Sequence, residues 1–255
     1  MAEAPSGMRS MIELAIRCLD LTSLDGSETP ERIRALCERA IRPAPDTPSV
    51  AAVVVYPPHV VTAADALRDS DVKVATVVGF PIPTEPLPKR LAEIHSAIEL
   101  GATEIDMVLN REALEAGRSE EAADEITQAK EAADLATLKV ILETGELRTD
   151  ERIHRAALLA MSAGADFLKT STGKVGTGAT PEAAVVMMRA VGDFHGQTGK
   201  AVGVKISGGI RTADQALGYL EIVEGELGEG WLTPDRFRIG ASTLLEVLLS
   251  RPGGQ

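Results

Sequence analysis

The sequence predicts an α/β protein of the (β/α)8 or TIM-barrel type, with residues 1–255 in a single domain. The length of 255 residues is suited to one such barrel. Short runs rich in Val, Ile and Leu alternate with longer amphipathic segments, as strands alternate with helices in this fold. Successive runs are separated by roughly 20–37 residues, which is the length of one βα unit.

Eight segments are predicted to be strands. Several are nearly continuous apolar runs, which indicates strands buried on both faces of a parallel sheet. The first segment is the weakest in this respect. The eight segments are Ile16–Thr22, Ala51–Tyr56, Val72–Val78, Thr103–Leu109, Leu138–Glu143, Asp166–Ser171, Val202–Ser207 and the region around Arg238.

Helical patterns fill the gaps between these segments. Thr180 and Thr212 stand where N-caps are favoured, and Gly164 follows a helical pattern as a C-terminal glycine does. We expect a helical segment over about residues 8–15 and a loose tail over 251–255. The rival fold is a doubly wound open sheet, but no Gly-x-Gly-x-x-Gly turn follows an early predicted strand.

Composition and charge disfavour several classes of partner. The net charge of -12 repels nucleic-acid backbones and anionic membrane surfaces, and aromatic residues are only 3% of the chain, so platforms for stacking bases are scarce. Cys18 and Cys37 form no Cys-x-x-Cys pair, which favours two reduced thiols. With no secretion signal and no apolar run of about 18 residues, we expect a soluble cytoplasmic protein.

Three predicted strands carry a charge within an apolar context. These charges are Asp106, Lys169 and Lys205, each in or near the C-terminal half of its strand. Burying an unpaired charge is costly, and the C-terminal end of a barrel is where active sites lie. One such residue alone is as often a paired core charge, whereas the three together predict a catalytic site. Similar positions on other strands are occupied by Asp20, Tyr56 and Glu143.

Two lysines and an aspartate in one pocket are sufficient for aldol chemistry. A free lysine is protonated at neutral pH, but desolvation and a neighbouring cation favour the neutral amine. A neutral amine attacks a carbonyl to form a Schiff base, which then draws electrons from an adjacent carbon–carbon bond. An aspartate with a water molecule can move the protons. Glu143 could assist, but a buried structural role fits it equally well.

The segments that follow the last predicted strands are rich in Gly, Ser and Thr. Such loops bring backbone N–H groups close to an anion, and the loops after strands 7 and 8 commonly bind phosphate in barrels. The alternative is that each glycine only makes a tight turn. Candidate phosphate-binding residues are Lys174, Gly208, Gly209, Arg211, Gly240 and Ser242.

Eight motifs along the chain resemble the 2-deoxyribose-5-phosphate aldolase family. GADFLKTSTGK (Gly164–Lys174) and VKISGGIRT (Val204–Thr212) are highly specific when they occur together in this order. The other motifs are DLTSL, VVVYP, VATVVGFP, ATEIDMVLN, LKVILETGEL and RIGAS.

The resemblance implies a class I aldolase that reversibly cleaves 2-deoxy-D-ribose 5-phosphate to D-glyceraldehyde 3-phosphate and acetaldehyde, without a cofactor or metal. It implies that Lys169 forms the Schiff base and that Lys205 lowers its pKa or aids proton transfer. Asp106 would be the acid/base and Asp20 part of a supporting network. The expected assembly is a homodimer or homotetramer. Gly173 joins the six loop residues above at phosphate-loop positions.

Two departures from the family pattern have consequences. Val54 stands where many members have a cysteine, so we expect better tolerance of reactive aldehydes. The printed sequence ends RPGGQ, without the terminal tyrosine that assists proton transfer in some members, so water or another group would serve in that step.

Two other functions remain alternatives at this point. One is another Schiff-base aldolase or transaldolase acting on a phosphosugar, and the other is a non-catalytic barrel that binds a sugar phosphate. A metal-dependent aldolase is disfavoured because the histidines show no metal-ligand spacing. They are His59, His95, His154 and His195.

Overall fold

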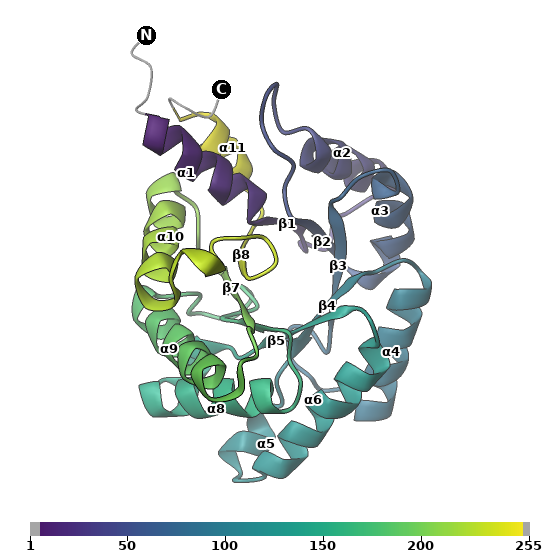
Figure 1. Cartoon of the computed structure of the whole chain (residues 1–255). Coiled ribbons are helices and arrows are strands. Elements are labelled where there is room, and N and C mark those ends of the chain that lie inside the picture. Colours follow the sequence, from purple (N-terminus) through teal and green to yellow (C-terminus); the bar gives the residue numbers. More distant parts are fainter. Residues whose placement is uncertain (1–5, 252–255) are drawn as a thin grey trace.

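Eight parallel strands form a closed barrel in the order of the chain, and β8 pairs with β1 (Figure 1). This arrangement, seen in a computed structural model that describes residues 6–251, confirms the predicted (β/α)8 fold. The strands are β1 (Leu19–Ser23), β2 (Ala52–Val55), β3 (Lys73–Val78), β4 (Glu104–Val108), β5 (Thr137–Ile141), β6 (Phe167–Lys169), β7 (Gly203–Ser207) and β8 (Phe237–Ala241).

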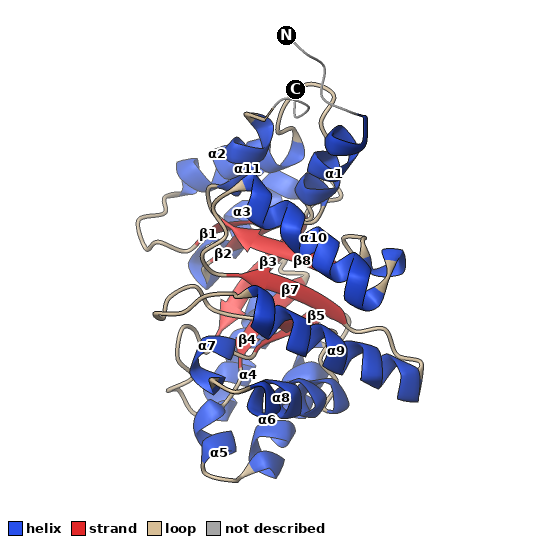
Figure 2. Ribbon diagram, turned by 90° about the vertical axis from the view of Figure 1, so that its left-hand side faces the viewer, coloured by secondary structure: helices blue, strands red, loops and turns tan. Residues whose placement is uncertain are grey.

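Helices surround the barrel and form its outer layer (Figures 1 and 2). Thr180 and Thr212 cap α9 and α10 as predicted, since each side chain accepts a hydrogen bond from the backbone N–H three residues later. The helices are α1 (Ser6–Arg17), α2 (Pro30–Ile41), α3 (Val60–Leu67), α4 (Leu87–Glu99), α5 (Arg111–Glu115), α6 (Ser119–Ala133), α7 (Thr144–Leu147), α8 (Asp150–Ser162), α9 (Pro181–Thr198), α10 (Ala213–Leu227) and α11 (Leu244–Leu249), with 3-10 turns η1 (Pro57–His59) and η2 (Glu229–Trp231).

Several predicted bounds were wrong by a few residues. The helix expected over 8–15 extends over Ser6–Arg17, and the first strand accordingly begins at Leu19 rather than Ile16. An apolar run at a helix–strand junction fits both periodicities, so the pattern alone does not place the boundary. β6 ends at Lys169, and its continuation is the loop at the barrel mouth. Of the predicted tail, residues 252–255 lie outside the described residues.

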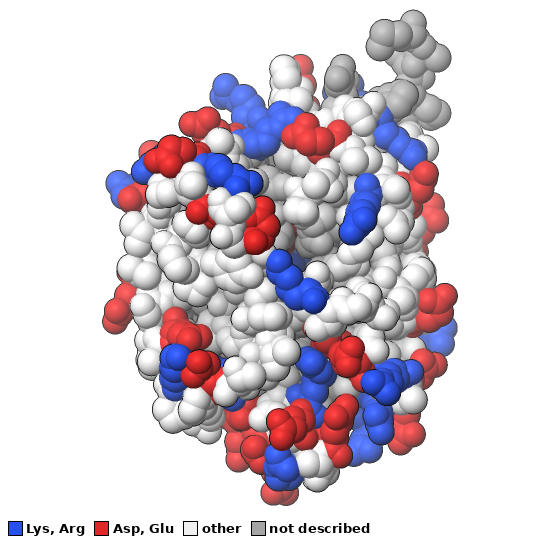
Figure 3. Space-filling model, turned by 180° about the vertical axis from the view of Figure 1, so that it is seen from behind, with Lys and Arg blue, Asp and Glu red and all other residues white. Residues whose placement is uncertain are grey.

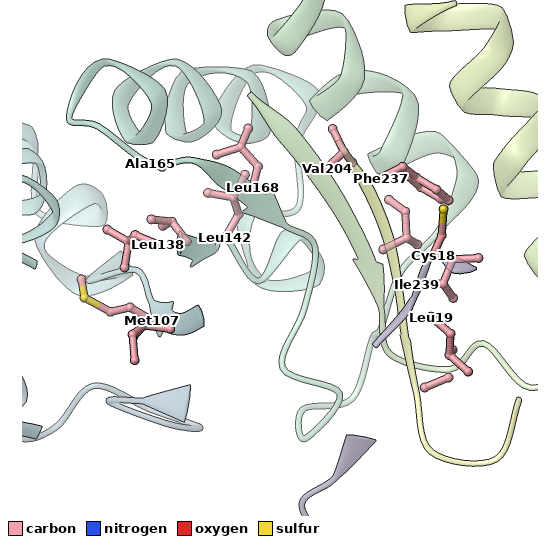
Figure 4. Packing of buried hydrophobic residues seen from close by; sticks show 14 of the residues in the cluster. Cys18, Leu19, Met107, Leu138, Leu142, Ala165, Leu168, Val204, Phe237 and Ile239 are labelled. Atoms are coloured by element: carbon pink, nitrogen blue, oxygen red, sulfur yellow. The ribbon is translucent and has the colours of Figure 1, made fainter. Parts of the chain in front are cut away.

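Alternation along the strands separates two kinds of core. Outward-facing side chains pack against the helices, as Figure 4 shows for Leu138, Leu168 and Val204. Inward-facing residues of β2 and β3 form a small apolar cluster that includes Val54 and Val77. Residues two apart on a strand share a face, so each strand contributes separately to the helix-facing and barrel-interior layers.

Glycine makes room inside the barrel at one strand pairing. Gly203 of β7 is the register partner of Phe167 of β6. A Cβ at Gly203 would lie 2.4 Å from the Phe167 ring, closer than packed atoms allow. The Arg238 guanidinium stands 5.6 Å from the centre of the same ring. The ring therefore fills the barrel interior where residue 203 has no side chain.

No helix within residues 6–251 combines the length and the apolar composition that crossing a bilayer demands.

Candidate active site

Charged side chains on six of the eight strands meet inside the barrel. The carboxylates come from Asp20, Glu104 and Asp106, and the bases are Lys139, Lys169, Lys205 and Arg238. All seven are buried. An unpaired buried charge would be strongly destabilising, so the geometry of their pairing determines whether this arrangement can exist.

Six of the seven form a closed ring in which acids and bases alternate. Starting from Glu104, the order is Lys139, Asp106, Lys205, Asp20, Arg238 and back to Glu104. The distances along this path are 2.5, 2.9, 2.8, 2.5, 2.6 and 2.8 Å. Every charge in the ring therefore has two partners of opposite sign.

Lys169 is attached to this ring as a seventh member. Its Nζ donates to Oδ2 of Asp106 at 2.8 Å, and the same oxygen accepts from Lys205 Nζ at 2.8 Å. Lys169 and Lys205 are register partners on β6 and β7. The network has three carboxylates and four bases, so deprotonation of Lys169 leaves three cations facing three carboxylates.

The surroundings lower the pKa values of both Lys169 and Asp106, which favours a neutral amine beside an ionised carboxylate. Burial is the largest influence on Lys169 and lowers its pKa to about 8; Lys205 also lowers it, whereas Asp106 raises it. For Asp106, burial alone would raise the pKa, but the adjacent lysines hold it well below the ordinary value. At neutral pH the site thus contains a carboxylate beside an amine that loses its proton readily.

A cavity of about 530 Å³ opens above Lys169 and Lys205 at the mouth where the strands end. Figure 3 looks onto this side of the molecule, where charged side chains of both signs lie mainly around the margin. The structure brings all seven predicted phosphate-loop residues to the cavity. They are Gly173, Lys174, Gly208, Gly209, Arg211, Gly240 and Ser242.

Glycines at four positions allow these loops to approach one another closely. Gly208 and Gly209 have φ of 91° and 84°, a conformation that favours glycine. A Cβ at Gly178 would lie 2.3 Å from the Gly208 carbonyl oxygen, so the loop after β6 rests directly on the loop after β7. A Cβ at Gly240 would lie 3.1 Å from Cε of Lys205. The glycine-rich sequence therefore permits close backbone contact around the cavity.

Sequence reasoning placed Asp20, Asp106, Lys169 and Lys205 together correctly but missed the rest of the ring. Glu104, Lys139 and Arg238 were within predicted strands and were not recognised as buried charges. The signal was present: Glu104 is two residues before Asp106 and so shares its inward face. Tyr56 lies one residue after β2, where it packs against the interior apolar cluster. Glu143 lies two residues beyond β5 and outside the ring.

Within 6–251, no three His, Cys, Asp or Glu side chains come together as a candidate metal site.

Fold and site together define a class of protein: a (β/α)8 barrel with an amine of lowered pKa at the floor of a polar cavity, which suits covalent chemistry on a carbonyl. The sequence profile of the DeoC/LacD family of aldolases matches residues 14–249. This chain belongs to the DeoC/LacD family of aldolases. Aldolase activity, the cleavage or formation of a carbon–carbon bond, is the activity of this family.

Individual relatives are similar over most of the chain. The deoxyribose-phosphate aldolase of Mus musculus is 46% identical over 245 residues, which cover 91% of this chain and 77% of the relative. The enzyme of the same name from Homo sapiens is 45% identical with the same coverage. A solved structure described as the unique tetrameric structure of deoxyribose phosphate aldolase from Aeropyrum pernix is 28% identical, with a TM-score of 0.74 and coverage of 96% of this chain and 98% of that chain.

Proposed function

We propose that this aldolase cleaves 2-deoxy-D-ribose 5-phosphate reversibly to D-glyceraldehyde 3-phosphate and acetaldehyde through a Schiff base on Lys169. The observation that carries the proposal is the position of Lys169: its Nζ is at the cavity floor, with a pKa lowered to about 8, and it donates to Asp106 at 2.8 Å. Relatives at 44–46% identity are named deoxyribose-phosphate aldolases.

Lys169 acts first as a nucleophile. Its neutral amine attacks the aldehyde carbon C1 of the open-chain sugar, and loss of water gives an iminium ion. This requires no metal ion, because the protonated nitrogen is itself the electron sink. Lys205 stabilises the neutral state of Lys169 by its positive charge and is a proton donor close to the reacting atoms.

Bond cleavage follows from the iminium. A base removes the proton of the C3 hydroxyl, the C2–C3 bond breaks, and D-glyceraldehyde 3-phosphate departs while C1 and C2 remain on Lys169 as an enamine. Protonation at C2 and addition of water release acetaldehyde and regenerate the amine. Asp106 is suited to carry these protons, directly or through water, because it contacts both Lys169 and Lys205. Asp20 pairs with Lys205 at 2.5 Å and holds it in place.

The phosphate is assigned to the glycine-rich loops at the cavity rim. Left-handed glycines at Gly173, Gly208 and Gly209 create concave backbone surfaces of the kind that bind anions. Lys174 and Arg211 add positive charge at the same rim. The sugar would then extend from the rim to Lys169, with its aldehyde at the floor.

We extend the proposal to assembly and location. The tetramer described for the Aeropyrum pernix protein favours a homo-oligomer, either a dimer or a tetramer. The free thiols of Cys18 and Cys37 favour a reducing compartment, as the cytoplasm provides.

A substrate panel tests the proposal. The purified protein would be incubated with 2-deoxyribose 5-phosphate, 2-deoxyribose, ribose 5-phosphate and fructose 6-phosphate, with the aldehyde products measured by a dehydrogenase-coupled assay. We expect cleavage of 2-deoxyribose 5-phosphate by far the fastest, and none by Lys169→Met. Preference for another phosphosugar would contradict the substrate assignment, and no cleavage of any would contradict catalysis.

A further inference from the structure

Glu143 combines two costly features at one position. Its side chain is fully buried, and its backbone has φ 56° and ψ 61°, the left-handed conformation that non-glycine residues seldom adopt. It lies between β5 and α7 and is not part of the interior ion-pair ring. Both the strained backbone and the buried carboxylate cost free energy, so we expect Glu143 to have a structural or functional role at this position.

The contacts of Glu143 are made to the loop that follows Lys169. Oε2 accepts from the Thr172 backbone N–H at 3.1 Å and from the Thr172 hydroxyl at 2.6 Å, and Oε1 lies 3.3 Å from the same N–H. The Thr172 hydroxyl in turn accepts from the Lys174 backbone N–H at 3.1 Å. One carboxylate thus fixes both ends of the turn Thr172–Lys174, and the two N–H groups that flank Gly173 are already used.

That arrangement leaves the middle of the turn open to a ligand. Gly173 has φ 72° and lines the cavity, and no other described residue accepts a hydrogen bond from its N–H. The far part of the loop is fastened separately, since Ala179 N–H donates to the Gly208 carbonyl at 3.0 Å and Gly145 packs against Thr177. Glu143 therefore orients the near part of the loop, which faces the cavity.

We propose that Glu143 is a positioning residue for substrate phosphate: it holds the backbone of Thr172–Lys174 so that the Gly173 N–H is presented to the anion, beside the Lys174 ammonium, which donates to the Leu24 carbonyl. This inference rests on the proposed phosphosugar function. It predicts a loss confined to recognition of the phosphate, because Lys169, Asp106 and Lys205 are held by the ion-pair ring and not by Glu143.

Three variants and one control test the role. Glu143→Gly removes the carboxylate while relieving the backbone, and Thr172→Val removes the hydroxyl that connects the carboxylate to Lys174. Glu143→Gln keeps one oxygen that can accept both bonds from Thr172. The control is Arg148→Gly, which relieves a left-handed residue with φ 65° at the other end of α7 without touching Thr172.

KM and kcat would be measured for 2-deoxyribose 5-phosphate and for unphosphorylated 2-deoxyribose, together with binding of inorganic phosphate by calorimetry. Glu143→Gly and Thr172→Val should raise KM for the phosphorylated substrate about tenfold and weaken phosphate binding similarly, consistent with lost charge-assisted contacts. For both variants we expect kcat, and kcat/KM for 2-deoxyribose, within about twofold of wild type. Glu143→Gln should recover most of the loss, and Arg148→Gly should show none.

Equal losses on both substrates, or unchanged phosphate binding in either variant, would overturn the positioning role while the proposed function stands. If Glu143→Gly fails to fold, Thr172→Val and Glu143→Gln decide by the same criteria. A wild-type enzyme that treats the two substrates alike would instead overturn the proposed phosphate site, and the role of Glu143 with it.

Discussion

At the scale of single residues, Lys169 owes its reactivity to its surroundings rather than to its type. Lys139 of the neighbouring strand β5 also contacts Asp106 and is also fully buried, yet its pKa is raised. Burial would lower it, but Asp106 and Glu104 both contact its ammonium and reverse the effect. Lys169 has one carboxylate contact and two lysines near it, so burial prevails there.

The protonation state of Lys169 makes the reaction depend on pH. Because only the neutral amine attacks the aldehyde, kcat/KM should rise with pH and level off above the pKa of Lys169 in the free enzyme, about 8. Lys205→Met removes a cation that lowers this pKa, so the rising limb should move to higher pH. Borohydride trapping of the adduct as a function of pH would measure it without relying on turnover. If the rising limb of the pH profile stays at the same pH in Lys205→Met, Lys205 does not lower the pKa of Lys169.

Val54 is the residue that bears on aldehyde tolerance. Val54 is fully buried in the interior cluster. The two cysteines of this chain are Cys18 and Cys37, and burial raises the pKa of their thiols to about 12 and 11. Those thiols have little thiolate and react slowly. Cys18 and Cys37 lie in the core between the barrel and its helices, whereas a cysteine at position 54 would face the barrel interior, where the aldehyde reacts. Val54→Cys should lose activity faster in concentrated acetaldehyde than wild type, measured as residual activity against time. Val54→Ala serves as the control for packing; equal decay in all three proteins would refute the expectation.

At the scale of elements, strand alternation determines which side chains face the barrel interior, and the absence of a side chain at Gly203 leaves room there for the Phe167 ring. Gly203→Ala would place a methyl group in the Phe167 ring, and we expect a loss of about 1–3 kcal/mol in the free energy of unfolding. Gly218→Ala is the matched control, because this helical glycine has open space around its Cβ position. That variant should gain up to about 1 kcal/mol. Urea denaturation measures both changes; equal effects would contradict the packing argument.

Predictability from sequence also differs by element. The strand patterns and the motifs around Lys169 and Lys205 predicted the barrel and its mouth, because apolar runs and glycine-rich turns are local signals. The ring was not fully predicted, since Arg238 meets Glu104 from a position 134 residues away and only barrel closure brings them together. The role of Glu143 likewise depends on a left-handed backbone that sequence patterns do not reveal.

At the scale of the whole molecule, strand pairing between β8 and β1 closes the barrel, and the ion-pair ring adds electrostatic links between strands. Arg238 of β8 connects to β1 through Asp20 and across the interior to β4 through Glu104. Acids and bases in such a ring depend on one another, since each removal leaves an uncompensated buried charge.

Removal of Arg238 should therefore be costly. We expect Arg238→Met to lose about 3–5 kcal/mol in the free energy of unfolding, measured in urea. Arg189→Met breaks an exposed pair with Glu226 and should leave the midpoint of urea unfolding nearly unchanged, because solvent screens this pair. Similar small effects for both would show that the ring contributes little to stability.

In the proposed mechanism, Lys169 forms the covalent intermediate. The most direct measurement is reduction with borohydride in the presence of 2-deoxyribose 5-phosphate or acetaldehyde, followed by peptide mass spectrometry. We predict a single reduced adduct on Lys169 that is absent in Lys169→Leu. An adduct on Lys205 would reverse the assigned roles of the two lysines, and no adduct in folded protein would contradict the Schiff-base mechanism.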